Sequence, residues 1–256
     1  MGALLVVVAL STERRAVLAY CSARPTDPIA GCPVMQGKSG PHVFSVLQAG
    51  LGCERARTAV LSAAETTHLE SVWSVGFAGG LADHLHTGAI VLPASILTLG
   101  QSTPSALDPR AQALRTALEQ AGLPVESGPL ITLDAPVHAP EAKRRLAKET
   151  GAVAADMEAA GVAEAAARIG CPCVALKVVL DDCRMLLPSV LSDAVTPGGD
   201  LVWRGLVRAL GAGSALLTLA RANRRASRRL AAALPAAILA WAALTPPGRS
   251  STMRVP

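Results

Sequence analysis

Hydrophobic and polar positions alternate along the chain with two different periods. Short runs rich in valine, isoleucine and leucine have the length of strands, and alanine-rich stretches between them repeat apolar residues every three or four positions. The runs predict strands over residues 4–9, 42–47, 71–75, 89–92 and 174–179. The stretches predict helices over residues 13–19, 53–67, 109–121, 139–150 and 157–169. Because this alternation is typical of strands joined by crossover helices, we expect an α/β fold with a mixed, largely parallel central sheet flanked by helices.

The composition changes this picture mainly at the C-terminal end. A chain of 256 residues with 51% hydrophobic and 17% charged residues has the size and make-up of a soluble protein with one main domain. Beyond residue 200 the sequence becomes rich in alanine, leucine and arginine, and Pro197, Gly198 and Gly199 precede this change. We therefore expect a main domain over residues 1–197 and a basic, helical C-terminal extension over residues 198–256.

The charges are divided unevenly between these two parts. All 19 acidic residues lie at or before Asp200, so residues 1–200 carry 15 basic and 19 acidic groups and a net charge of −4. Residues 201–256 carry nine arginines and no acid, which gives a net charge of +9. We therefore do not expect the main domain to bind nucleic acid, whereas the extension is suited to binding anions.

Three apolar segments are candidates for a leader or a membrane anchor. Residues 1–10 lack the basic start and cleavage site of a signal peptide, so we expect a buried first strand there. The apolar runs over residues 209–220 and 230–244 are shorter than a bilayer span, and Pro235 interrupts the second, so no transmembrane helix is predicted. The six cysteines show no Cys-x-x-Cys pair and no zinc-ligand spacing, which favours reduced thiols in the cytoplasm and no metal.

A glycine-rich run directly follows a predicted strand. It reads Val75, Gly76, Phe77, Ala78, Gly79, Gly80, Leu81. Glycines at such a place let the backbone approach a ligand closely, although a tight turn without a ligand explains them as well.

Two acidic segments add to this signal. Asp156 and Glu158 open the helix predicted over residues 157–169, where an acid can equally serve as a helix cap. Asp181 and Asp182 follow the strand predicted over residues 174–179. Carboxylates at the carboxyl end of a buried α/β strand lie where ligands bind, although a solvated turn fits at least one of the two.

The order of these three segments resembles the nucleoside phosphorylase and nucleosidase superfamily. The resemblance covers roughly residues 4–190 and includes Glu13 after the first predicted strand, with Gly50 and Gly52 after the second. It implies an enzyme that cleaves the N-glycosidic bond between a purine and a ribose, without a cofactor and as a homo-oligomer.

A narrower likeness is to the phosphorylase associated with hopanoid biosynthesis, which is thought to release adenine from adenosylhopane. It rests on the arginine-rich tail and on Asp134, Ala135, Pro136, Val137, Glu141, Lys143, Arg144, Leu187 and Pro188. The near alternative is a nucleosidase for small soluble nucleosides such as methylthioadenosine or S-adenosylhomocysteine. An alternative of another class is a non-catalytic, membrane-associated module with the same fold.

The resemblance also implies a role for each acid. Asp181 matches the general acid that protonates the departing purine, a role suited to a partly buried carboxyl group with a raised pKa. Glu158 matches the carboxylate that binds the ribose hydroxyls, with Met157 as an apolar wall beneath the sugar. Glu13 matches the residue that orients an attacking water, although a solvated position in a first helical turn explains it equally well. The predicted substrate-binding set also includes Ala78, Gly79 and Asp156.

The nucleophile, phosphate or water, is expected at the backbone amides of Gly50, Gly52 and Gly76. Lys177 belongs to the same predicted set because its position is often arginine in relatives, although an edge-strand lysine in solvent is the alternative. Phe77 stands where many relatives carry a serine that contacts phosphate, which favours hydrolysis over phosphorolysis. Relatives stack adenine on an aromatic residue near Pro136, and this chain has none there.

The extension carries five arginines at a spacing that places them on one face of a helix. They are Arg221, Arg224, Arg225, Arg228 and Arg229, with apolar surface from Leu216, Leu217, Leu230, Leu234, Ile238 and Trp241. Such a helix favours peripheral contact with an anionic membrane, which would suit a lipid-linked substrate, and a helix packed on the body is equally consistent with it. A nucleic-acid partner is disfavoured because no aromatic residues interleave the arginines.

Overall fold

The structure is a computed structural model that describes the chain except residues 1–2, 100–104, 109, 188–195, 201–212 and 245–256. The first half contains β1 (Ala3–Val8), α1 (Ser11–Val17), β2 (Ser22–Ile29), β3 (Cys32–Ser39), β4 (His42–Gln48), α2 (Cys53–Thr66), β5 (Leu69–Gly80), β6 (Ile90–Val91), β7 (Ser95–Thr98) and β8 (Ser105–Ala106). The second half contains α3 (Ala111–Gln120), β9 (Val125–Glu126), β10 (Leu130–Thr132), α4 (Pro140–Thr150), β11 (Ala154–Asp156), α5 (Ala159–Arg168), β12 (Cys173–Asp181) and α7 (Gly213–Leu244).

The described strands form one 12-stranded mixed sheet. At its centre β1 pairs in parallel with β4 and β5, and β5 pairs in parallel with β12. On the other side of its final residues, β5 pairs with β11 in the antiparallel sense. The carboxyl ends of β1, β4, β5 and β12 therefore meet at one edge of the sheet, which confirms the predicted fold class.

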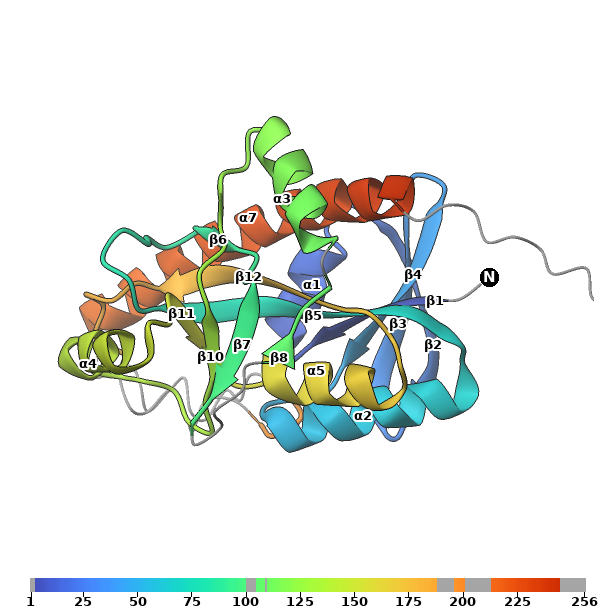
Figure 1. Cartoon of the computed structure of the whole chain (residues 1–256), viewed down its shortest axis with the longest axis horizontal. Helices are drawn as coiled ribbons and strands as arrows, with labels where there is room; N and C mark the ends of the chain where they lie inside the picture. Colours follow the sequence, from blue (N-terminus) through green and yellow to red (C-terminus); the bar gives the residue numbers. More distant parts are fainter. Residues whose placement is uncertain (1–2, 100–104, 109, 188–195, 201–212, 245–256) are drawn as a thin grey trace, which may run out of the picture.

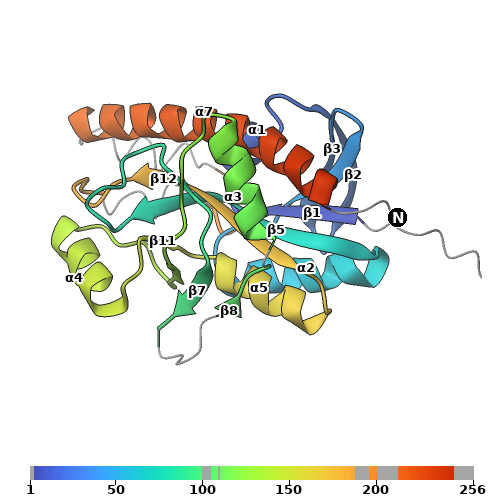
Figure 2. The same ribbon diagram turned by 45° about the horizontal axis from the view of Figure 1, so that its top comes forward.

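Helices cover both faces of this sheet (Figures 1 and 2). Alanine-rich α2 and α5 pack together on one face and share a core cluster with Leu5, Val7 and Leu47. Their approach requires Gly161, because a Cβ atom there would lie 2.1 Å from the carbonyl oxygen of Cys53. The opposite face is covered by α1, α3 and α7, over a second core cluster that includes Trp73.

The helix α7 packs on the main body as part of this second cluster. Its inward residues are Ala226, Leu230, Ala233, Leu234, Ala237, Ile238 and Trp241. The Trp241 ring meets Trp73 edge to face at 5.6 Å between centroids, and the Arg110 guanidinium lies 4.0 Å from the centroid of the Trp241 ring. Four of the six apolar residues that we expected around the arginines thus belong to the core, which favours the alternative of a helix packed on the body. The division into two domains at residue 197 stays a prediction.

Within the described residues, which resume at Gly213, the two apolar runs of the extension lie in one helix. Pro235 lies inside α7, and over Leu217–Leu244 the helix is long and apolar enough to cross a bilayer by length and composition alone. Run length alone therefore does not exclude a membrane span here, and the absence of a transmembrane helix stays a prediction. Because its apolar stripe faces the second core cluster, the helix has the character of a packed core helix.

Most of the strands and helices that we predicted are present, with three differences. The glycine-rich run is part of β5 instead of a turn after it, because β11 and β12 supply backbone partners as far as Gly80. Asp156, Met157 and Glu158 precede α5 and do not open it. The hairpin of β2 and β3 and the short strands β7 to β11 were not predicted, because exposed or very short strands have no long apolar run.

Candidate active site

Glu13 lies at the carboxyl end of β1 and binds three backbone amides. Its Oε2 accepts hydrogen bonds from the N–H groups of Ala9 (2.9 Å) and Leu10 (2.8 Å), and its Oε1 accepts one from Phe77 (2.6 Å). Glu13 lies in the first turn of α1, as the alternative had it, but its side chain is buried, so the expected solvation is wrong. Burial raises the pKa of Glu13, while Lys177 and the three amides oppose this rise.

Gly76 is required by this arrangement. A Cβ atom at position 76 would lie 2.4 Å from Oε1 of Glu13, which is well inside van der Waals contact. The glycine that was predicted to present a backbone amide to the nucleophile thus also makes space for the carboxyl group of Glu13.

Asp156 and Lys177 form a buried ion pair. The Nζ of Lys177 lies 2.8 Å from Oδ2 of Asp156, and the lysine is 2% exposed. Lys177 lies on β12, between β5 and β6, so the alternative of an edge-strand lysine in solvent is wrong. Burial alone would lower the pKa of Lys177, but the carboxyl groups of Asp156, Glu158 and Glu13 raise it.

The carboxyl oxygens of Asp156 also accept hydrogen bonds from the start of α5 and from the end of β10. Oδ2 accepts a hydrogen bond from the Ala159 amide at 2.9 Å, and Oδ1 accepts one from the Thr132 hydroxyl at 2.7 Å. The Thr132 hydroxyl oxygen in turn accepts a hydrogen bond from the Ala160 amide at 3.1 Å. Asp156 therefore acts as a helix cap, the alternative that the sequence left open, and it anchors the segment that carries Glu158.

Glu158 reaches across to the glycine loop after β4. Its Oε1 accepts a hydrogen bond from the Gly52 amide at 2.9 Å, and Gly52 has a φ of 98°, a backbone conformation that favours glycine. Burial and the neighbouring charge of Asp156 raise the pKa of Glu158 to about 8, although Lys177 lowers it. Met157, half-buried, precedes it in the chain.

These contacts gather three carboxyl groups around one ammonium group. Glu13, Asp156 and Glu158 all act on Lys177, so full ionisation would leave an excess of negative charge in a buried place. A ligand that brings positive charge or hydroxyl donors would relieve this excess. The arrangement is therefore suited to stabilising a cation-like sugar ring.

Asp181 lies at the carboxyl end of β12, beside the backbone of Gly79. A Cβ atom at Gly79 would lie 3.4 Å from Oδ2 of Asp181, so the carboxyl group sits directly over the glycine. Burial raises the pKa of Asp181 to about 6, against an opposing effect of Lys143, whose Nζ lies 2.5 Å from Oδ2. Asp182 accepts a hydrogen bond from the Arg184 amide in an exposed turn, so the solvated-turn alternative fits Asp182 alone.

Sheet register relates Asp181 to the other acids. Gly79 of β5 is paired with Asp181 of β12 on one side and with Ala155 of β11 on the other. Two strand spacings amount to about 10 Å, which is comparable to the length of a nucleoside. Ala78, buried, precedes Gly79 on the same strand.

The segment at the predicted domain boundary also contacts this edge. The Leu51 amide donates a hydrogen bond to the Pro197 carbonyl at 3.0 Å, and the Ser11 amide donates one to the Gly199 carbonyl at 3.0 Å. At Gly50, with a φ of 87°, a Cβ atom would lie 2.2 Å from the Pro197 oxygen. Gly50 is therefore held beneath the backbone of residues 197 and 198.

Sequence reasoning missed two residues of this site. Thr132 gave no signal, since its role depends on β10 lying beside β11. Lys143 entered only through the narrower family likeness, because a lysine on a predicted helix is ordinarily solvated. Within the residues that the structure describes, no three His, Cys, Asp or Glu side chains are arranged to hold a metal ion.

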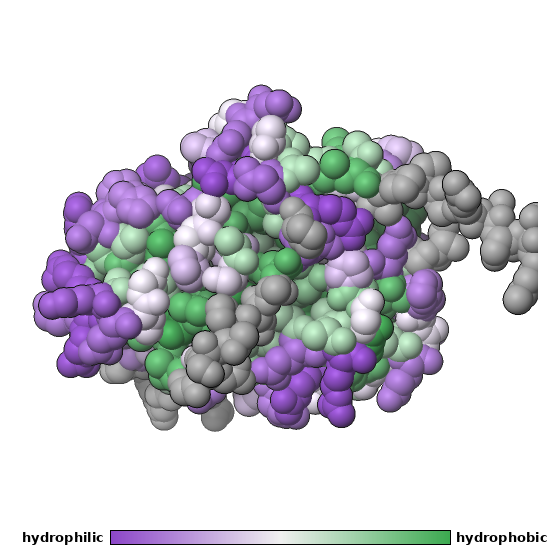
Figure 3. Space-filling view, in the orientation of Figure 1, coloured by the Kyte–Doolittle hydropathy of each residue, from purple (hydrophilic) through white to green (hydrophobic). Residues whose placement is uncertain are grey.

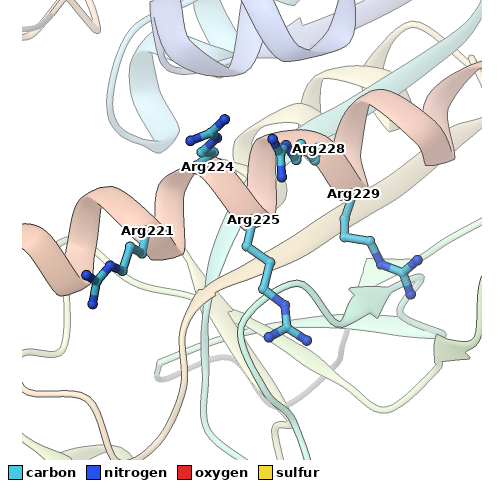
Figure 4. A pocket seen from close by; sticks show the side chains of 5 residues that line it. All are labelled: Arg221, Arg224, Arg225, Arg228 and Arg229. Carbon is cyan, nitrogen blue, oxygen red and sulfur yellow. The ribbon is translucent and has the colours of Figure 1, made fainter.

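A second polar feature lies on α7, away from these acids. Arg221, Arg224, Arg225, Arg228 and Arg229 line an open hollow with a volume of about 380 Å³ (Figure 4). The stems of Arg225 and Arg229 pack near Gly88, and Arg229 donates a hydrogen bond to the Gly88 carbonyl at 3.4 Å. None of the five makes an ion pair with an acid in the described part of the chain.

Solved structures share the fold of this chain. The Helicobacter pylori 5'-methylthioadenosine/S-adenosylhomocysteine nucleosidase, solved with 5'-methylthioadenosine in its active site, superimposes with a TM-score of 0.73 at 14% identity, over 93% of this chain and 98% of that one. Futalosine hydrolase of Helicobacter pylori gives a TM-score of 0.71 at 15% identity, over 93% and 99% of the two chains.

Sequence comparison identifies relatives and a family. The 5'-methylthioadenosine/S-adenosylhomocysteine nucleosidase of Haemophilus ducreyi is 29% identical over 170 residues, which is 60% of this chain and 73% of the relative. The enzyme of the same name from Glaesserella parasuis is 26% identical over 193 residues, which is 69% and 84% of the two chains. The model of the phosphorylase superfamily matches residues 3–188. The chain therefore belongs to the phosphorylase superfamily, and the predicted class, an enzyme that cleaves an N-glycosidic bond, is confirmed.

Proposed function

We propose that this protein cleaves the N-glycosidic bond of a purine nucleoside and releases adenine, with Asp181 as the general acid. The observation that carries this proposal is the register at Gly79, which has the buried Asp181 on one side and the segment leading to Glu158 on the other. The named relatives, which are nucleosidases of methylthioadenosine and S-adenosylhomocysteine, support a purine nucleoside as the substrate.

The proposed reaction proceeds through an oxocarbenium-like sugar. The bond between the anomeric carbon and the purine nitrogen breaks, and its electron pair leaves with the purine. Asp181 donates its proton to a ring nitrogen, so the base departs as a neutral molecule. The developing sugar cation favours the ionised forms of Glu158 and Glu13, whose pKa values burial raises, and their negative charge stabilises it in return. An oxygen nucleophile then adds to the sugar.

Water is the proposed nucleophile: the Glu13 carboxylate orients it and takes the proton that the water loses as its oxygen bonds to the anomeric carbon. The carboxyl group accepts three amide hydrogen bonds at the edge where Gly50 and Gly52 also lie, and it is held in one orientation by them. The side chain of Phe77 belongs to the core cluster beneath α7, and it offers no hydroxyl to a phosphate. Measuring base release with and without phosphate, and identifying the sugar product, tests this choice.

The finer identity of the nucleoside has two candidates. Adenosylhopane is the first candidate substrate. With this lipid-linked substrate, we propose that the protein binds peripherally to the cytoplasmic face of a membrane. The outward face of α7 supports this, because its arginines are flanked by Leu217 (62% exposed) and Leu239 (48% exposed). Methylthioadenosine is the second candidate and is favoured by the relatives.

Replacing Asp181 with asparagine tests the chemistry of the proposal. Because the amide keeps the shape but has no proton to donate, Asp181→Asn is expected to reduce kcat by about 100-fold or more with either nucleoside. Free adenine is measured by liquid chromatography, and circular dichroism checks the fold. Asp27→Asn, at an exposed position of β2, is the matched control and should keep its activity. Normal turnover of Asp181→Asn, or no adenine from either nucleoside with the unmodified protein, would contradict the proposal.

A further inference from the structure

Lys143 is a buried cation that the proposed reaction does not yet use. It lies on α4 and is 1% exposed, although its chain neighbours Arg144 and Arg145 are exposed. Figure 3 shows the hydrophilic residues that gather over α4 at the left of the molecule. Burying a lysine in this way is unfavourable unless its ammonium group is paired and hydrogen-bonded.

The partners of Lys143 match the three N–H groups of an ammonium ion. Its Nζ donates to Oδ2 of Asp181 at 2.5 Å, to the Asp182 carbonyl at 2.8 Å and to the Met185 carbonyl at 3.1 Å. All three partners are acceptors and all belong to the end of β12 and the turn after it. The lysine therefore fastens this turn to α4.

We propose that Lys143 is a positioning residue for Asp181: it holds one carboxyl oxygen of the general acid in place at the end of β12. The inference rests on the proposed role of Asp181. Because Lys143 binds Oδ2, the carboxyl group is fixed beside Gly79 and Oδ1 is left for the substrate.

The ion pair with Lys143 affects the pKa of Asp181, and therefore the pH dependence of the proposed reaction. Burial raises the pKa of Asp181 and the neighbouring Asp182 adds to the rise, while Lys143 is the main opposing charge. The facing strand β5 presents glycines, which do not titrate. Without Lys143 the pKa of Asp181 would rise further above about 6, since an opposite charge nearby lowers a carboxyl pKa by about 1–3 units.

The sign of the pH effect follows from the role of the acid. Activity requires protonated Asp181, so kcat/KM should fall as the pH rises through the pKa of that group. In Lys143→Met, the decrease of kcat/KM should occur at a pH about one unit or more higher than in the unmodified protein. The kcat at the optimum should drop by about 10-fold, because the carboxyl group is less well held. Lys143→Arg keeps the charge and should leave the fall near the pH of the unmodified protein.

The experiment compares pH profiles of adenine release for the full-length protein and its variants. Lys148→Met, an exposed lysine on the same helix, is the matched control and should leave the profile unchanged. An unshifted profile in a folded Lys143→Met protein would overturn the inference. If that variant folds poorly, unfolding of the double variant with Asp181→Asn provides the test. Lys143→Met should destabilise the unmodified protein more than the Asp181→Asn protein, and equal destabilisation would contradict the pairing.

The two proposals fail in distinguishable ways. If Asp181→Asn keeps its activity, Asp181 is not the general acid, and the inference on Lys143 is contradicted as well. If Asp181→Asn is inactive while Lys143→Met keeps the original pH profile, only the positioning role of Lys143 is lost.

Discussion

Single glycines decide how closely the acids of this site approach the backbone. At Gly76 the carboxyl group of Glu13 occupies the space that a side chain would need, and at Gly79 the carboxyl group of Asp181 lies over the strand. The sequence indicated that these glycines serve a close approach, but it predicted a ligand as the approaching group. In the structure the approaching groups are the protein's own carboxyl groups.

At this scale, Gly76→Ala is expected to displace Glu13. A Cβ atom 2.4 Å from Oε1 would force the carboxyl group off the amides of Phe77, Ala9 and Leu10. We predict a loss of activity of about 100-fold and a fall in the free energy of unfolding of about 1–3 kcal/mol, measured by adenine release and urea denaturation. Gly198→Ala is the control, because a Cβ atom at position 198 would have its nearest neighbour 3.6 Å away. This variant should change neither the activity nor the free energy of unfolding. Full activity of Gly76→Ala would show that Glu13 is dispensable.

The element that sequence analysis described least well is α7. Its arginine spacing predicted one basic helical face correctly, since all five arginines line the same hollow. The apolar residues of the helix were expected to surround this basic face. Leu230, Leu234 and Ile238 instead lie on the opposite side of the helix, in the core. A single helix cannot reveal which of its apolar residues meet a sheet, because that depends on where the sheet's own apolar face lies.

At the scale of this element, Leu230→Ala is expected to destabilise the whole protein. The side chain is fully buried between α7 and the sheet, so its truncation should lower the free energy of unfolding by about 2–5 kcal/mol. The exposed Leu239→Ala on the same helix is the control and should stay within about 0.5 kcal/mol of the unmodified protein. Urea denaturation measures both. An effect of Leu230→Ala no larger than the control's would mean that α7 is a separable extension.

At the scale of the molecule, the division of charge separates two surfaces. Residues 1–200 carry a net charge of −4. On α7, by contrast, Arg221, Arg224 and Arg228 are exposed and have no acidic partner among the described residues. A cation-rich surface of this kind is attracted to anionic lipid head groups, with about 1 kcal/mol for each basic residue near the membrane.

We therefore predict that the full chain binds vesicles of phosphatidylglycerol but not of phosphatidylcholine. Replacing Arg221, Arg224 and Arg228 with glutamine should weaken this binding by about 100-fold in a sedimentation assay, and added salt should weaken it further. Glutamine at Arg144, Arg145 and Lys148, three exposed basic residues of α4, is the matched control. Equal binding to both kinds of vesicle, or no effect of the α7 replacements, would argue against a membrane role.

The sequence by itself determined the features that depend on residues close to one another along the chain. Local periodicity was sufficient for β1, β4, α2 and α4, and the order of the glycine run, Asp156 to Glu158 and Asp181 indicated the family that the comparisons confirm. The tertiary structure alone decided which charges meet: Lys177 with Asp156, and Lys143 with Asp181, which lie 38 positions apart. The physical reason is that hydrophobic periodicity is a local property, whereas the state of a buried charge depends on partners that adjacent strands and helices bring to it.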